Sequence, residues 1–209
     1  MNRCDVKLRE GCLGRFTVIF MVYFLTMVVI KAGQFRIKGE GGGVVMDDWT
    51  FSAIFASYLI VVTGALYEYF WTAPRVAPVV SIVGYCLATA GVVIMRRCIR
   101  SLGPYWSPRI EVKKGHQIRE EGPYRASRHP YYLASLLELG GLCLILNSFR
   151  MFAYLVVVHI PIVMARIRSE ERVLTTVLGS RYVQYKERIP IIPVLPSLTA
   201  AVLRKFDRL

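Results

Sequence analysis

Acidic residues and histidines are scarce in this sequence, and the short motifs of many soluble enzyme classes are missing. The 209 residues include 14 Asp+Glu and 3 His, against 27 Lys+Arg. No P-loop, zinc-protease H-E-x-x-H or hydrolase G-x-S-x-G motif occurs. The five cysteines have no regular spacing and form no C-x-x-C pair, which excludes a secreted disulfide scaffold and gives no indication of zinc. No nucleic-acid-binding motif accompanies the net charge of +13.

What the sequence does contain is more apolar residue than a soluble domain of this size can bury. Hydrophobic residues make up 55% of the chain, and the mean hydropathy is +0.44. A soluble surface could not hold the remaining apolar residues and also be this basic. Since Lys and Arg commonly flank membrane-spanning helices, the composition predicts an integral membrane protein.

Two long apolar runs, 49–70 and 76–95, are typical of spanning helices, which need roughly 20 apolar residues. The short turn between them contains two prolines, which favours antiparallel neighbours. A shorter run, 16–30, follows several basic residues as a signal sequence would. Because no small-residue cleavage site follows, we interpret it as a retained helix. Residues 33–48 are rich in glycine and predict a flexible connector.

Two further apolar runs, 131–146 and 151–165, are each shorter than a full span and predict a tight helical hairpin with both ends on one membrane face. Glu138, within the first arm, is interpreted as a structural hydrogen-bonding group that faces the bundle interior. Basic residues dominate 96–128 and the chain from 166 onward, which predicts that both stretches are cytoplasmic. The N-terminus would then lie outside, although the basic residues before the first run favour the opposite, so its side stays open.

The expected fold is therefore all-α, a polytopic membrane bundle of about five transmembrane helices. Residues 1–95 would supply about three of them. Residues 96–209 would form a core that contains the hairpin 131–165 and ends in a cytosolic segment. Since both ends of the hairpin lie on one face, the polar segments before and after it are expected to meet there.

Polar, aromatic-rich motifs stand on both sides of the hairpin. Before it come Leu102-Gly-Pro-Tyr-Trp, Gly115-His and Gly122-Pro-Tyr-Arg-Ala-Ser-Arg-His-Pro-Tyr-Tyr; after it come Arg166-Ile-Arg-Ser-Glu-Glu, Gly179-Ser-Arg-Tyr-Val-Gln-Tyr and Arg188-Ile-Pro. Taken singly, Arg128-His129-Pro130 is a basic interfacial cap, His116 a loop histidine, and Glu170-Glu171 a solvated acidic turn. Their gathering at one membrane face favours a pocket where a charged small molecule meets an apolar one.

This set of motifs, in this order over residues 102–193, resembles the isoprenylcysteine carboxyl methyltransferase family. The resemblance implies an integral membrane enzyme that uses S-adenosyl-L-methionine, without a Rossmann domain, in a pocket that faces the cytosol. By the same resemblance the cofactor pocket would be lined by His116, Ile118, Gly122, Tyr124, His129, Pro130, Tyr132, Glu171, Tyr182 and Tyr185. The catalytic residues that face the acceptor would be Arg166 or Arg168 with Glu170, and Arg128 could serve either side. Ala134 departs from the family pattern, which often has glycine there, and its extra bulk would narrow a lipid-side tunnel.

The implied reaction is O-methylation of the carboxylate of an isoprenylcysteine or similar lipophilic acceptor. The implied partners are that prenylated acceptor and membrane lipids, with no metal, nucleic acid or obligate protein partner. A carboxylate is already ionised at neutral pH and needs no base, and arginine can hold it with two hydrogen bonds. A phenol or an amine would need a proton acceptor, for which Glu170 or His116 is available.

Other functions stay open at this point. One alternative is a phospholipid N-methyltransferase or a lipophilic phenol O-methyltransferase. Another is an NADPH-dependent enzyme that resembles sterol reductases, for which 209 residues is short. The last is a basic membrane scaffold without activity, which the concentration of polar groups within a membrane protein disfavours.

Overall fold

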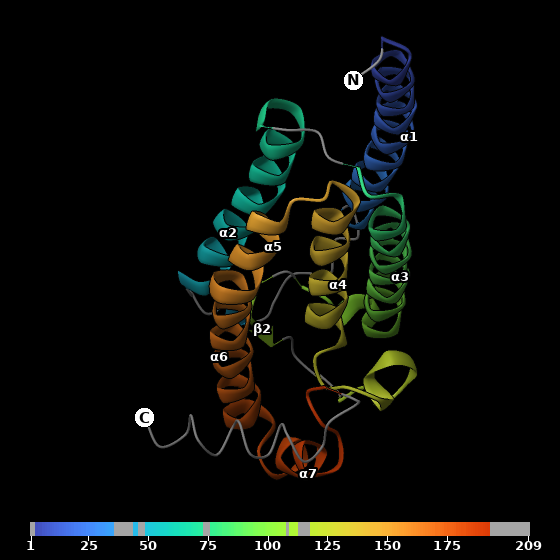
Figure 1. Ribbon diagram of the computed structural model, residues 1–209. Coiled ribbons are helices and arrows are strands. Elements are labelled where there is room, and N and C mark those ends of the chain that lie inside the picture. The colour runs from blue at the N-terminus through green and yellow to red at the C-terminus, as the bar shows by residue number, and fades with distance from the viewer. Residues whose placement is uncertain are drawn as a thin grey trace.

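The computed structural model describes residues 3–35, 44–45, 49–72, 76–107, 109–112 and 118–192. Within them the chain forms a helical bundle with one pair of two-residue strands. The elements are α1 (Arg3–Phe35), β1 (Val44–Val45), α2 (Trp49–Tyr67), η1 (Glu68–Thr72), α3 (Pro78–Leu102), η2 (Gly103–Tyr105), β2 (Glu111–Val112), η3 (Gly122–Arg125), α4 (Pro130–Ile145), α5 (Phe149–Tyr154), η4 (Leu155–His159), α6 (Ile160–Leu178) and α7 (Ser180–Arg188). Figure 1 shows α4 between α3 and the continuous helix made by α5, η4 and α6, with α7 across one end of the bundle.

Within the part of the chain that the structure describes, four helical segments are long and apolar enough to cross a membrane: Gly14–Gly33, Trp49–Thr72, Pro78–Tyr105 and Phe149–Leu178. A fifth apolar helix, α4, is shorter. Large apolar side chains point outward from the long helices; Val79 is 74% exposed and Val157 is 71% exposed. A surface of this kind is stable in lipid and not in water. The predicted all-α bundle of about five membrane helices is confirmed, and the chain is a multi-pass membrane protein.

Two helices are longer than the apolar runs that predicted them. α3 continues to Leu102, so the division expected after residue 95 falls inside one helix. The second arm of the hairpin, predicted to end at 165, continues to Leu178. Charged residues are compatible with a helix, and both helices end where a glycine takes a positive φ, 53° at Gly103 and 60° at Gly179. Hydropathy therefore locates the membrane-embedded part of each helix and does not locate its end.

The connector predicted over 33–48 contains some regular structure. α1 extends as far as Phe35, and β1 pairs antiparallel with β2, with Val44 opposite Val112. The rest of this segment lies outside the described residues. The strand pair joins the connector to the chain that follows α3 and lies beside α6.

The helices α3 and α4 pack with their backbones in direct contact. A Cβ atom placed on Gly141 would lie 2.5 Å from the amide nitrogen of Ala88, and one placed on Gly84 would lie 2.5 Å from the amide nitrogen of Ile145. A Cβ on Gly91 would likewise come within 2.6 Å of the α4 backbone. Small residues permit this close approach between membrane helices, whose packing depends on dispersion contacts. The interface holds the first turn of α4 at a defined position beside α3.

Polar side chains within the membrane segments face one another. Glu138 Oε2 lies 2.8 Å from Lys31 Nζ, which joins α4 to α1. His159 Nδ1 lies 2.9 Å from Ser57 Oγ, which joins η4 to α2. Glu138, interpreted from the sequence as an interior hydrogen-bonding group, thus has Lys31 as its partner.

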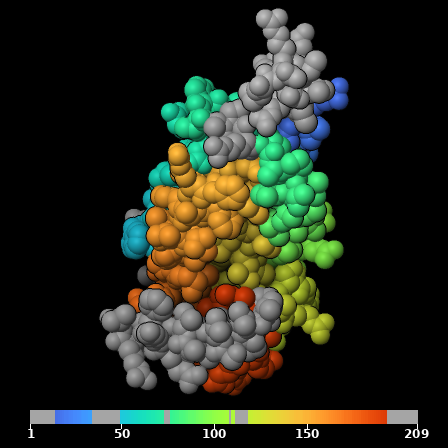
Figure 2. All heavy atoms as spheres, viewed as in Figure 1, coloured from blue at the N-terminus to red at the C-terminus, as the bar shows by residue number. Residues whose placement is uncertain are grey.

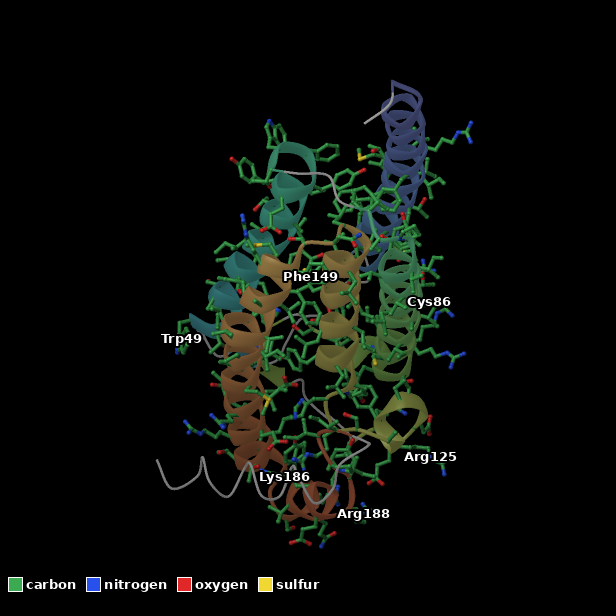
Figure 3. The ribbon with its side chains drawn as sticks, viewed as in Figure 1. Trp49, Cys86, Arg125, Phe149, Lys186 and Arg188 are labelled. Atoms are coloured by element: carbon green, nitrogen blue, oxygen red, sulfur yellow. The ribbon has the colours of Figure 1, made fainter. Side chains whose placement is uncertain are left out.

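Both ends of the helical hairpin lie at one end of the bundle. The labelled residues Arg125, Lys186 and Arg188 lie at the end that carries α7, and Phe149, at the hairpin turn, lies well away from it (Figure 3). The first turn of α4 and the last turns of α6 are both at the α7 end (Figure 1). The two groups of motifs are therefore neighbours, as the hairpin predicted.

Candidate active site

A cavity of about 380 Å³ lies among α2, α3, α4, α6 and α7 near this end of the bundle. In Figure 2, α7 (red) and the segment around η3 (yellow) meet below the α5–α6 helix (orange). Helical spacing explains which residues of each helix line the cavity, because residues three or four apart share one face of a helix. α2 contributes Phe51, Ile54, Phe55 and Tyr58, and α6 contributes Arg166, Glu170, Leu174 and Leu178. The volume falls in the range of about 300–1,000 Å³ that is common for small-molecule sites.

Arg166 places a fixed positive charge on the cavity wall. The residue is only 3% exposed. Its Nε donates to the hydroxyl of Tyr132 (3.3 Å), and its Nη1 donates to Oγ1 of Thr50 (3.3 Å). The guanidinium carbon lies 5.9 Å from the centre of the Phe51 ring. Since a guanidinium keeps its charge when buried and has five N–H donors, it can both hold these partners and bind an anion.

Glu170 faces the cavity one helical turn after Arg166. Its Oε2 accepts a hydrogen bond from the hydroxyl of Tyr132 at 2.8 Å. The same hydroxyl accepts the hydrogen bond from Arg166, so Tyr132 links the two charged side chains. Among the described lining residues, Glu170 is the only carboxylate. It can bind a cationic group or accept a proton.

Glu171 forms ion pairs behind the cavity wall. Its Oε1 lies 3.0 Å from Nε of Arg128 and 3.1 Å from Nε2 of His129, and its Oε2 lies 2.9 Å from Nζ of Lys186. Arg128 also donates to the backbone carbonyls of Lys186 and Ile189. These contacts join the loop before α4, the helix α6 and the helix α7. Glu171 therefore positions Arg128 and His129, which do line the cavity.

Three buried tyrosines, Tyr124, Tyr182 and Tyr185, line the cavity at the α7 end. Burial raises the pKa of Tyr124 and of Tyr182, and it raises the pKa of Tyr185 to about 12. The hydroxyl of Tyr185 donates to the carbonyl of Tyr124 at 3.0 Å. The three side chains are therefore neutral phenols whose ring faces can attract a cation.

The structure brings most of the predicted site residues together. The cavity is lined by Ile118, Tyr124, Arg128, His129, Tyr132, Arg166, Glu170, Tyr182 and Tyr185. Four others are not on the described wall: Gly122, Pro130, Arg168 and Glu171. Gly122 has a φ of 57°, which favours glycine, and Pro130 is the first residue of α4. His116 lies outside the described residues.

Two expectations concerned Arg168, as an alternative to Arg166, and Ala134, as a residue that narrows a tunnel. Arg168 follows Arg166 by two positions, which at 3.6 residues per turn places the two side chains on nearly opposite faces of α6. Ala134 is fully buried and packs with Met95 and Trp106, without lining the cavity itself. Its bulk therefore acts on the α3–α4 contact and not directly on a tunnel.

Several lining residues carry no motif and were missed from the sequence. Lys31 of α1 and the four residues of α2 come from the N-terminal region, where only hydropathy was informative. Arg109, Arg119 and Ser135 also line the cavity, and so does Tyr131, which lies within a quoted motif but was not named as a site residue. One sequence signal points to part of this set, the aromatic residues at helical spacing on α2.

The cavity wall is strongly basic and also carries apolar and aromatic side chains. Among the described lining residues, a single carboxylate, Glu170, stands against five cationic side chains, those of Lys31, Arg109, Arg119, Arg128 and Arg166. Glu138 and Glu171 lie behind the wall and each neutralise one cation. The remaining excess of positive charge, next to the aromatic wall of α2, favours an anion attached to an apolar body.

Part of the chain is similar in sequence to known proteins. The model of the isoprenylcysteine carboxyl methyltransferase (ICMT) family matches residues 81–176. Protein-S-isoprenylcysteine O-methyltransferase B of Arabidopsis thaliana is 28% identical over 110 residues, which cover 51% of this chain and 55% of that protein. The uncharacterized protein YpbQ of Bacillus subtilis (strain 168) is 28% identical over 93 residues, which cover 42% of this chain and 55% of that protein.

A solved structure of the eukaryotic intramembrane Ras methyltransferase ICMT has a similar fold. The TM-score is 0.53 at 23% sequence identity, over 72% of this chain and 55% of that chain. The chain spans about half the length of the relatives it matches.

Proposed function

We propose, on the premise that this chain belongs to the isoprenylcysteine carboxyl methyltransferase family, that it is an S-adenosyl-L-methionine-dependent O-methyltransferase. Its acceptor is the carboxylate of an isoprenylcysteine or a comparable lipophilic acid, and its cavity faces the cytosol. One observation carries the proposal: buried Arg166 and the carboxylate of Glu170 face a single cavity whose α2 wall is apolar and aromatic. Such a cavity suits a polar cofactor and a lipophilic acceptor at the same time.

The residues at the α7 end of the cavity fit S-adenosyl-L-methionine, which carries a sulfonium, an ammonium, a carboxylate and an aromatic base. When bound, it supplies an electrophilic methyl carbon. Tyr124, Tyr182 and Tyr185 offer ring faces for the sulfonium and the base. Glu170 offers a carboxylate for a cationic group, and Arg128 offers a guanidinium for the carboxylate.

Arg166 is placed to hold the acceptor. A carboxylate is ionised at neutral pH, so no residue has to remove a proton from it. Methyl transfer is an in-line displacement, for which correct positioning can supply about 7–11 kcal/mol of the barrier. The apolar chain of the acceptor would lie along Phe51, Ile54 and Phe55 of α2. The excess positive charge of the wall disfavours a cationic amine as the acceptor.

Methyl transfer by the purified protein tests the proposal. The protein in detergent is incubated with methyl-labelled S-adenosyl-L-methionine and a farnesylcysteine analogue. We expect a labelled product that is lost on treatment with base, because methyl esters are base-labile. No transfer to this acceptor or to other lipophilic acids would contradict the proposal, and a base-stable product would instead assign the chain to phenol or amine methylation.

Replacement of Arg166 with lysine is expected to lower kcat/KM roughly 100-fold, because an ammonium cannot hold a carboxylate with two parallel hydrogen bonds. The matched control is Arg168→Lys, the same change two residues away and off the described wall, which is expected to stay within about twofold of the wild type. Both variants are assayed for initial rates at several acceptor concentrations. A larger loss for Arg168→Lys than for Arg166→Lys would show that the acceptor contact is assigned to the wrong residue.

A further inference from the structure

Lys31 is an ammonium on the cavity wall at membrane depth, outside the segment 81–176 that matches the family. It lies in the candidate span Gly14–Gly33, and its side chain is 22% exposed. Nζ donates to the hydroxyl of Tyr58 (2.8 Å) and lies 2.8 Å from Oε2 of Glu138. Since an ammonium has three N–H donors, one of them has no hydrogen-bond partner among the described residues, and Nζ also lies 4.4 Å from the centre of the Tyr58 ring.

The buried Arg166 and the partly buried Lys31 contact the same two helices, α2 and α4, at different positions along the bundle. On α2, Arg166 contacts Thr50 and Lys31 contacts Tyr58. These positions are eight residues apart, which corresponds to about 12 Å along the helix axis. Their contacts on α4 are six residues apart, or about 9 Å. The cavity therefore presents two cations that are separated by roughly 10 Å along the bundle.

α1 has contacts with the bundle besides the ion pair. The hydroxyl of Thr17 forms a hydrogen bond with that of Tyr69 (2.6 Å), and the hydroxyl of Tyr23 forms one with that of Thr89 (3.2 Å). Phe20 of α1 is fully buried in the same interface. Buried ion pairs are often no more stabilising than well-packed apolar residues, whereas ionisable residues in membrane segments usually mark binding sites.

We propose that Lys31 is a second acceptor-binding residue that determines specificity. Its third N–H donates a hydrogen bond to an oxygen atom, a hydroxyl or a carbonyl, in the chain of the lipophilic acid. This oxygen lies roughly 10 Å from the carboxylate at Arg166, toward the lipid side. Glu138 and Tyr58 hold the ammonium in place and leave the donor free for the ligand. The inference rests on the proposed function, which identifies the acceptor as a lipophilic acid.

The test compares two ligands and two proteins. The ligands are octadecanoic acid and the same acid with a hydroxyl at mid-chain, each radiolabelled. The proteins are the wild type and the double variant K31M/E138L, which replaces the whole ion pair with apolar residues and leaves no buried charge unpaired. Binding is measured in detergent without the cofactor, methyl transfer is measured in parallel, and thermal unfolding confirms that the variant is folded.

We expect the wild type to bind the hydroxy acid about tenfold more tightly than the plain acid, as for one hydrogen bond to a charged group. The double variant should bind both acids alike. A wild type without preference, or a double variant that keeps the preference, would overturn the inference. Because binding is read without turnover, the two proposals can fail separately. A preference for the hydroxy acid in a protein that transfers no methyl group to the farnesylcysteine analogue or to either fatty acid would leave the role of Lys31 in binding standing and refute the proposed function. Methyl transfer without a preference for the hydroxy acid would refute the role of Lys31 and leave the proposed function standing.

Discussion

Replacement of Glu171 with alanine is expected to lower the free energy of unfolding by about 3–5 kcal/mol and to abolish methyl transfer. Glu171 is 9% exposed, and its two oxygens contact Arg128, His129 and Lys186. Without the carboxylate, the guanidinium of Arg128, whose side chain is 7% exposed, stays buried with its charge uncompensated. The loss of these pairs would also release α7 from α6, and with it the tyrosines of the cavity wall.

The control for this variant is Glu187→Ala, which removes the same charge from an exposed position of α7. Its free energy of unfolding should remain within about 0.5 kcal/mol of the wild type. Glu171→Gln keeps the shape of the side chain and should fall between the two. Unfolding is followed by denaturant titration in mixed micelles. If Glu171→Ala unfolded at the same midpoint as Glu187→Ala, the ion-pair cluster would have no structural role.

Replacement of Gly141 with valine is expected to separate α3 from α4 and to cost about 3 kcal/mol of stability. The new Cβ would lie 2.5 Å from the amide nitrogen of Ala88 and 2.7 Å from the carbonyl oxygen of Gly84. Both are backbone atoms of α3, which cannot move aside as the end of a side chain can. Since α4 carries lining residues in its first turns, we also expect weaker acceptor binding in any folded fraction.

The preceding residue supplies a matched control. A Cβ on Gly140 would meet only the ring of Phe152, at 3.6 Å, which is an ordinary van der Waals distance. Gly140→Ala should therefore be neutral or slightly stabilising, because alanine also has the higher helix propensity. The two variants are compared by thermal unfolding and by yield in detergent. Equal behaviour of Gly141→Val and Gly140→Ala would contradict the close backbone contact.

The sequence alone determined the membrane class, the approximate positions of the helices and the meeting of the two motif groups. Each of these depends on local information. Hydropathy over about 20 residues marks a span, and a hairpin of two short apolar arms returns the chain to the face from which it left. The resemblance to the ICMT family was carried by the same motifs and is confirmed by the match over residues 81–176. The proximity of His129 and Glu171 follows from this topology.

Only the tertiary structure decided which side chains form the wall. The choice between Arg166 and Arg168 depends on how α6 is rotated about its axis, and packing against α2 and α4 sets that rotation. Glu171 was expected on the wall and instead lies behind it, for the same reason. The pairing of Lys31 with Glu138 joins residues more than a hundred positions apart, and no local pattern reports such a contact. Apolar membrane helices have similar compositions, so composition does not tell which helices are neighbours. Side-chain packing across the whole bundle fixes the neighbours of each helix and its rotation about its own axis.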